Sequence, residues 1–163
     1  MQSTYLPSLV SSPPGPARAA DGIELELMAS KVSVINPEFT GHAFMCIFVK
    51  FNGGIKEDCY GFYSQNGVRG YIGGPGLVDS EFSKNFERFG RIQAAISLSV
   101  TEAQRRQILS LVSEWNRKDY NLTNQQCVDF IRAVASVVGG PIPAYDATDF
   151  PADFLTKLIK LRN

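Results

Sequence analysis

Residues 41–63 read GHAFMCIFVKFNGGIKEDCYGFY, and this stretch decides the predicted fold. Its first part, residues 41–51, is a nearly continuous apolar run, which is typical of a strand buried on both faces. The segment Asn52-Gly53-Gly54 predicts a hairpin turn, because glycine accepts positive φ without steric cost. Residues 55–63 are therefore expected to return as the second strand of the hairpin.

The flanking segments add further strands to this hairpin. Residues 23–27 alternate apolar and acidic side chains, which is the period-2 pattern of a half-buried strand. Residues 92–100 predict a third main strand, and residues 32–34 predict a short one. The glycine-rich residues 66–80 are expected to form a loop.

Three helices are predicted after the strands. The first is expected over residues 101–116, because its opening threonine and the glutamine three residues on make a capping box. The second is expected to begin at Thr123, with Gln126 in the same capping pattern, and to stop at Gly139. Pro151 suits the first turn of a short last helix. Strands followed by helices favour an α+β fold, an antiparallel sheet packed against helices.

Length and composition place the chain among single-domain globular proteins. Its 163 residues suffice for one hydrophobic core. The segment of residues 1–21 is rich in proline, glycine and serine and predicts a disordered N-terminal arm, which leaves residues 22–163 as one domain.

Charge and hydropathy exclude some classes of partner. The 16 basic and 16 acidic residues cancel, so nothing indicates a general affinity for nucleic acid or for an anionic membrane. No stretch is long and apolar enough for stable membrane insertion. The N-terminus has no basic segment followed by an apolar one, which predicts synthesis in the cytoplasm without a cleaved signal. Export by a route that needs no cleaved signal stays open.

Two residues carry the predicted chemistry. Cys127 falls in the first turn of its predicted helix, where the helix dipole favours the reactive thiolate. His42 is the only histidine and begins the most apolar strand, where it can serve as a base if it reaches the thiol. The alternatives are a small core cysteine and a satisfied, partly buried strand histidine. Taken together, the pair indicates a cysteine hydrolase.

The other two cysteines are expected to be structural. Cys46 and Cys59 fall on facing hairpin strands, and a core role for both is favoured over a disulfide bond. An odd number of cysteines predicts at least one free thiol. No CxxC spacing or nearby histidine pair is present, so no zinc site is expected.

Two segments resemble a known superfamily. Residues 41–44 (GHAF), the hairpin and residues 60–63 (YGFY) resemble the histidine hairpin of circularly permuted NlpC/P60 (papain-like) enzymes. Residues 120–130 (YNLTNQQCVDF) are similar to their Asn-Cys-x-x-Phe helix, with Gln126 in place of the asparagine. This branch includes lecithin:retinol-acyltransferase-like proteins, and its histidine strand precedes its cysteine helix. The resemblance covers roughly residues 40–135.

The resemblance implies a permuted papain-like fold and cleavage of an amide bond through an acyl-enzyme, without a metal or organic cofactor. It implies a peptide or peptidoglycan substrate, as for an antibacterial effector that a secretion machine exports to a target-cell periplasm. Such an effector needs a cognate immunity protein in its producer. The alternatives are a lipid acyltransferase or phospholipase of the same branch, and a non-catalytic binding module in which the predicted catalytic pair is separated.

The remaining site residues are assigned by the same resemblance. A papain-like site holds its imidazole with a polar residue on the next strand. A turn centred on Gly53 places Ser64 opposite His42, and a main-chain carbonyl or a water is the alternative. The oxyanion would bind the N–H of the nucleophile and a second donor, Gln126 or Tyr120. Tyr120 is equally compatible with a core or loop position.

Overall fold

The computed structural model describes residues 22–31, 41–70, 72–80, 92–146 and 149–163. Its strands and helices are β1 (Gly22–Ser30), β2 (His42–Phe51), β3 (Gly54–Ser64), the 3-10 helix η1 (Gly67–Gly70), β4 (Gly74–Ser80), β5 (Ile92–Ser99), α3 (Glu102–Trp115), β6 (Asp119–Tyr120), α4 (Cys127–Val138) and α5 (Pro151–Arg162). The predicted arm and the predicted short strand lie outside these residues.

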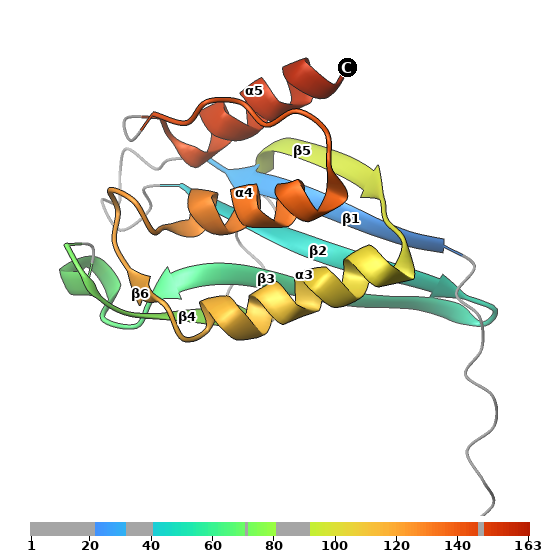
Figure 1. Cartoon of the computed structure of the whole chain (residues 1–163), viewed down its shortest axis with the longest axis horizontal. Coiled ribbons are helices and arrows are strands. Elements are labelled where there is room, and N and C mark those ends of the chain that lie inside the picture. The colour runs from blue at the N-terminus through green and yellow to red at the C-terminus, as the bar shows by residue number, and fades with distance from the viewer. Residues whose placement is uncertain (1–21, 32–40, 71, 81–91, 147–148) are drawn as a thin grey trace, which may run out of the picture.

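The architecture is α+β, as predicted. Six strands form one sheet in the order β5-β1-β2-β3-β4-β6, and every neighbouring pair is antiparallel. The helices α3, α4 and α5 lie side by side on one face of the sheet (Figure 1). In this layer α5 contacts β1 and β5, α4 contacts β2 and β3, and α3 contacts β4.

The main core lies between the helices and the sheet face that they cover, which we call the helix face. Strand alternation sends Ala43, Met45 and Ile47 of β2 toward this core. The opposite face, the second face, carries a smaller buried cluster. Its members are Met28, Phe44, Cys46 and Cys59.

The predicted hairpin is confirmed, and it contains a disulfide bond. The β2–β3 register pairs Cys46 directly with Cys59. Their sulfur atoms are bonded, with the Cα atoms 4.0 Å apart. The prediction that both are unbridged core cysteines is therefore wrong, because directly opposite residues point to the same face with their Cβ atoms close together. The free thiol predicted from the odd count is Cys127.

The glycine-rich segment is only partly a loop. Its second half is β4, which pairs with β3 over five residues. The loop prediction failed there because ladder hydrogen bonds use the backbone, which glycine also provides. At Gly76 a side chain has no room, since an added Cβ would lie 2.5 Å from the Phe62 ring and 2.7 Å from the Lys118 carbonyl oxygen.

Gly76→Ala is therefore expected to destabilise the fold by about 1–3 kcal/mol, the usual cost of overpacking. The Phe62 ring can shift, but the Lys118 carbonyl belongs to the backbone. Urea unfolding gives the measurement, with Gly22→Ala as the matched control, because a Cβ at Gly22 meets nothing within 4 Å. Equal midpoints for the two variants would contradict the steric argument.

Most helix boundaries follow the sequence signals. Gln104 N–H donates to Thr101 Oγ1 over 3.2 Å, and Thr101 N–H donates to Gln104 Oε1 over 2.8 Å, so the first predicted capping box is present. Helix α4 ends before Gly139, whose φ of 86° is one that other residues rarely adopt. Helix α5 begins at Pro151, as predicted.

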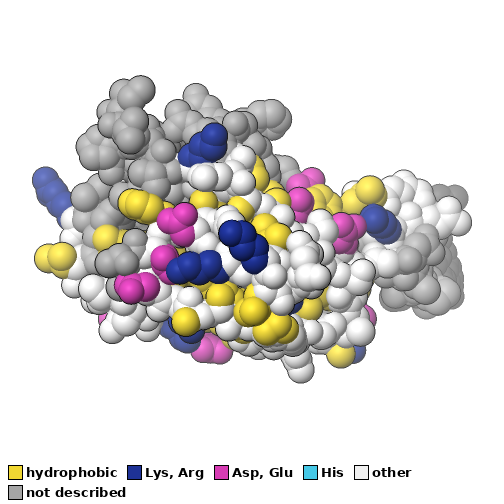
Figure 2. Space-filling view, turned by 90° about the horizontal axis from the view of Figure 1, so that it is seen from above, with side chains coloured by type: hydrophobic (Ala, Val, Ile, Leu, Met, Phe, Trp, Pro, Cys, Tyr) yellow, Lys and Arg dark blue, Asp and Glu magenta, His cyan; other side chains and the backbone are white. Residues whose placement is uncertain are grey.

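Charged side chains of both signs are interspersed on the molecular face seen in Figure 2. By strand register, the second face of the sheet carries three glutamates, Glu24, Glu26 and Glu57. Burial raises the pKa of Glu26 above its ordinary value, and the nearby carboxylates of Glu24 and Glu57 raise it further. None of the helices in the described ranges is both long and apolar enough to cross a membrane.

Glu26→Gln is expected to raise the free energy of unfolding at neutral pH. A carboxyl group whose pKa is higher in the folded state destabilises that state when it is ionised. The advantage of the variant should shrink as the pH falls through the folded-state pKa, and vanish below the ordinary glutamate pKa, where both states are protonated. Urea unfolding of both proteins between neutral and acidic pH measures this. A difference that does not change with pH would contradict the electrostatic origin.

Candidate functional site

The candidate nucleophile opens its helix one turn later than the sequence suggested. Helix α4 begins at Cys127, and its N-cap is Gln126, whose N–H donates to Asp129 Oδ2 over 3.1 Å. The predicted start, Thr123, lies instead in a turn, where its N–H and Oγ1 both donate to Asn121 Oδ1. The prediction of a start at Thr123 is wrong because an asparagine side chain competes for the same threonine groups.

This correction improves the setting of Cys127 for nucleophilic chemistry. As the first helical residue, it has a backbone N–H for which the helix offers no acceptor. The positive end of the helix dipole lies at the same place. The side chain is buried, with 3% of its surface exposed. The helix N-terminus can therefore stabilise negative charge on an oxygen beside the sulfur, whereas burial opposes the formation of charge there.

Tyr145 is the residue of this cluster that sequence reasoning missed. Gln126 Nε2 donates to the Tyr145 hydroxyl oxygen over 2.5 Å and to the Leu122 carbonyl over 2.6 Å. Burial raises the pKa of Tyr145, and electrostatic interactions with Cys127 and Asp129 add to this effect. The phenol therefore keeps its proton at neutral pH and is a hydrogen-bond donor within electrostatic reach of the thiol.

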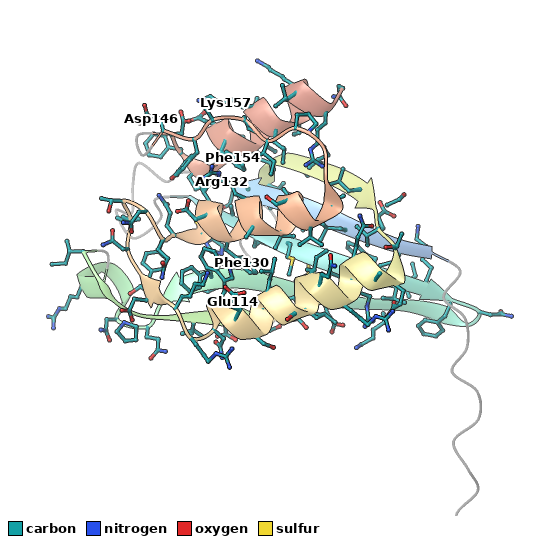
Figure 3. All side chains as sticks on the ribbon, in the orientation of Figure 1. Glu114, Phe130, Arg132, Asp146, Phe154 and Lys157 are labelled. Carbon is teal, nitrogen blue, oxygen red and sulfur yellow. A yellow bond between two sulfur atoms is a disulfide. The ribbon has the colours of Figure 1, made fainter. Side chains whose placement is uncertain are left out.

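No sequence signal marks Tyr145. It lies in an irregular, proline-containing segment with no periodicity, and its position depends on packing against α5. Its ring meets that of Phe154 edge-on, with centroids 5.8 Å apart. The Arg132 guanidinium carbon also lies 5.8 Å from the ring centroid, and Arg132 Nη1 lies 3.3 Å from Asp129 Oδ1. Figure 3 shows Arg132 and Phe154 on the neighbouring helices α4 and α5.

The predicted base, His42, has its ring on the second face. It stacks on Tyr63 with centroids 4.4 Å apart and on Phe44 with centroids 6.0 Å apart. Phe44 belongs to the second-face cluster, whereas Cys127 belongs to the core on the helix face. The start of β2 lies beneath the start of α4 (Figure 1). The sheet nevertheless separates the two side chains, so the described structure does not form the predicted pair.

The third predicted residue, Ser64, was placed by a register that is off by one. The paired positions of β2 and β3 sum to 105, which puts Tyr63, not Ser64, at the position opposite His42. A shift of one residue reverses the face of a side chain, so Ser64 points to the helix face. Its Oγ accepts a hydrogen bond from Asn66 N–H over 3.2 Å.

The two predicted oxyanion donors lie in different surroundings. Gln126 adjoins the nucleophile and bonds to Tyr145. Tyr120 is buried in the aromatic core, with its ring centroid 5.3 Å from that of Phe62. The described structure thus brings Cys127, Gln126 and Tyr145 together, and it places His42 on the other side of the sheet.

Comparison of the chain with protein-family models, curated proteins and solved structures finds no match.

Proposed function

We propose that this protein is a thiol hydrolase that cleaves an amide bond, with Cys127 as its nucleophile. One observation carries the proposal: of three cysteines, the single free thiol is the first residue of an amphipathic helix. The other two cysteines are joined to each other in the disulfide bond. A free thiol at a helix N-terminus has the positive end of the helix dipole and a spare N–H donor beside it.

The proposed reaction follows from these groups. The Cys127 thiolate attacks the amide carbonyl, and the resulting oxyanion accepts hydrogen bonds from the Cys127 N–H and the Tyr145 hydroxyl. Collapse of this intermediate breaks the C–N bond and gives a thioester, while the amine leaves with a proton from the base. Water then adds to the thioester, which releases the carboxylic acid and returns the thiol.

His42 remains the proposed base, and this role carries a structural requirement. Its ring must reach the helix face of the sheet. This requires a rotation of the backbone at the start of β2, next to Gly41, whose φ is 80°. The finer fold assignment, a permuted papain-like arrangement, belongs to the same proposal. It is supported by the antiparallel sheet covered by helices on one face and by a histidine strand that precedes the cysteine helix.

The proposed substrate is a peptide amide, with bacterial peptidoglycan as the leading case. The sequence resemblance alone supports this choice of substrate. It also supports the proposed export to a target-cell periplasm and the proposed need for an immunity protein. The test is to incubate the wild-type protein with purified peptidoglycan in water enriched in oxygen-18, with hydroxylamine present in a parallel sample. One heavy oxygen in each new carboxylate and a hydroxamate in the trapped sample are expected. Folded protein that releases neither product from peptidoglycan or from its stem peptides would overturn the proposal.

A second candidate function is a non-catalytic binding module. The observation that favours it is the stacking of the His42 ring on Tyr63, on the face of the sheet away from Cys127. The two candidates differ in the rate of Cys127 alkylation by iodoacetamide as a function of pH. A catalytic pair predicts an acid-shifted profile that His42→Ala moves back toward that of an ordinary thiol. A binding module predicts the same profile for both proteins.

Tyr145→Phe is expected to lower kcat by about a hundredfold, the usual cost of one oxyanion donor. Phenylalanine keeps the ring contacts and removes only the hydroxyl. The measurement is kcat on the peptide amide, with unfolding by urea as a check on the fold. Because the hydroxyl acts after the thiolate has formed, the alkylation rate of Cys127 should change little. An unchanged kcat would remove Tyr145 from the proposed machinery.

A further inference from the structure

The disulfide bond lies beside carboxylates on the second face of the sheet. Glu57 stands two residues before Cys59 on β3, and alternation sends both side chains to the same face. Glu57 Oε1 lies 3.5 Å from Cys59 Sγ. One ligand atom each from Cys46, Glu57 and Cys59 can be chosen so that all lie within 4.8 Å of one another. Two sulfurs and one carboxylate oxygen therefore meet in a space of the size of a metal site.

A third strand adds a further carboxylate to this group. Glu26 of β1 pairs with Cys46 in the antiparallel register, so its side chain points to the same face. The carboxylates of Glu26 and Glu57 therefore lie on the same face of the sheet as the sulfur pair, and both carry the charge that attracts a cation.

We propose that the reduced form of this protein binds Zn²⁺ through Cys46, Cys59 and Glu57. Reduction of the disulfide bond takes two electrons and two protons from a dithiol, which is itself oxidised to a disulfide. Zinc then displaces both thiol protons and is held by two thiolates and one carboxylate. Glu26 or a water completes the four-coordinate shell that zinc prefers.

The arrangement suits zinc better than harder cations. Thiolates favour soft or borderline metals, whereas magnesium and calcium select oxygen ligands. The two thiolates project from directly opposite positions of one hairpin, so a single ion can bridge them at the usual Zn–S distance of about 2.3 Å. Reoxidation by a low-molecular-weight disulfide rejoins the two sulfurs and releases the ion. The same pair therefore exchanges zinc for a covalent bond according to the redox state.

No local sequence pattern marks this proposed zinc site. Zinc signatures are recognised by ligands a few residues apart on one segment, such as CxxC. Here the two cysteines are 13 positions apart and meet only because the β2–β3 register pairs them. The proposal does not rest on the hydrolase activity, because Cys127 lies in the core on the other face of the sheet.

The test is a titration of the full chain with zinc chloride, once after reduction by a phosphine and once in the oxidised form. Isothermal calorimetry should give one ion per reduced chain and no binding to the oxidised chain. Cobalt(II) as a second probe should produce thiolate-to-metal charge-transfer absorption. Glu57→Gln, at an exposed position, should keep the fold and weaken zinc binding by at least roughly tenfold.

Two further variants decide the ligands. Cys46→Ser removes one of the two thiolates and should lower both zinc affinity and the intensity of the cobalt charge-transfer band, and Cys127→Ser should leave zinc affinity unchanged. The proposal is overturned if reduced, folded wild-type protein binds no zinc. It is also overturned if Cys46→Ser binds as tightly as wild type, if the oxidised chain binds equally well, or if Cys127→Ser abolishes binding.

Discussion

Cys127→Ala is expected to abolish release of peptide fragments from peptidoglycan, with a fall in kcat/KM of at least about a thousandfold. Alanine keeps the Cβ and the helix-forming tendency at this position and removes only the sulfur, so α4 should still form. Without the thiolate no acyl-enzyme can form, and the hydroxamate produced in the presence of hydroxylamine should disappear as well. Mass analysis of the soluble fragments measures both effects.

The matched control is the double variant Cys46→Ser, Cys59→Ser. It removes the sulfurs of the other two cysteines from the second face of the sheet, and it should retain turnover if the fold is intact. Circular dichroism and urea unfolding establish whether each variant is folded. Equal product from wild type and from folded Cys127→Ala would end the nucleophile assignment, whatever substrate is finally identified.

Local signals predicted much of the fold. The capping pair Thr101 and Gln104 determined the start of α3, because both hydrogen bonds form within four residues. Pro151 at the start of α5 and Gly139 after α4 act equally locally, through the fixed φ of proline and the positive φ of glycine. The hairpin turn at residues 52–54 belongs to the same class. Features that neighbouring residues decide were therefore accessible without a structure.

Features that depend on strand register, or on side chains that compete for the same hydrogen bonds, could not be predicted from the sequence. Placing the turn centre half a residue too late moved the expected partner of His42 from Tyr63 to Ser64, and thereby to the other face of the sheet. At the start of α4, the side chain of Asn121 bonds Thr123 and leaves Gln126 as the N-cap. Both outcomes depend on small differences between alternatives that the sequence pattern does not rank.

The position of Tyr145 shows a third kind of limit. Nothing in residues 141–149 distinguishes this tyrosine, and it joins the site only because α4 and α5 pack side by side. Its ring lies near both Phe154 of α5 and Arg132 of α4. A residue whose role comes from the packing of two helices has no local sequence signal. For this reason the predicted site differs from the structure more than the predicted fold does.

The largest expected effect on stability is that of Phe62→Ala, which should lower the free energy of unfolding by about 3–5 kcal/mol. The Phe62 ring is fully buried, with centroids 5.0 Å from Trp115 of α3 and 6.5 Å from Phe130 of α4. Figure 3 shows Phe130 pointing from α4 toward α3. Truncating Phe62 therefore leaves a cavity where two helices meet the sheet. Urea unfolding measures the loss, and Phe51→Ala, at a position that is 37% exposed, is the matched control.

A double-mutant cycle with Gly76→Ala tests whether the aromatic cluster is packed as described. Part of the cost of a Cβ at Gly76 comes from the Phe62 ring, so this substitution should be less costly once the ring is gone. The clash with the Lys118 carbonyl remains, so some cost should persist. Strictly additive effects would mean that the ring and Gly76 are not in contact. A coupling between them would place β4 against the same core that holds α3 and α4 on the sheet.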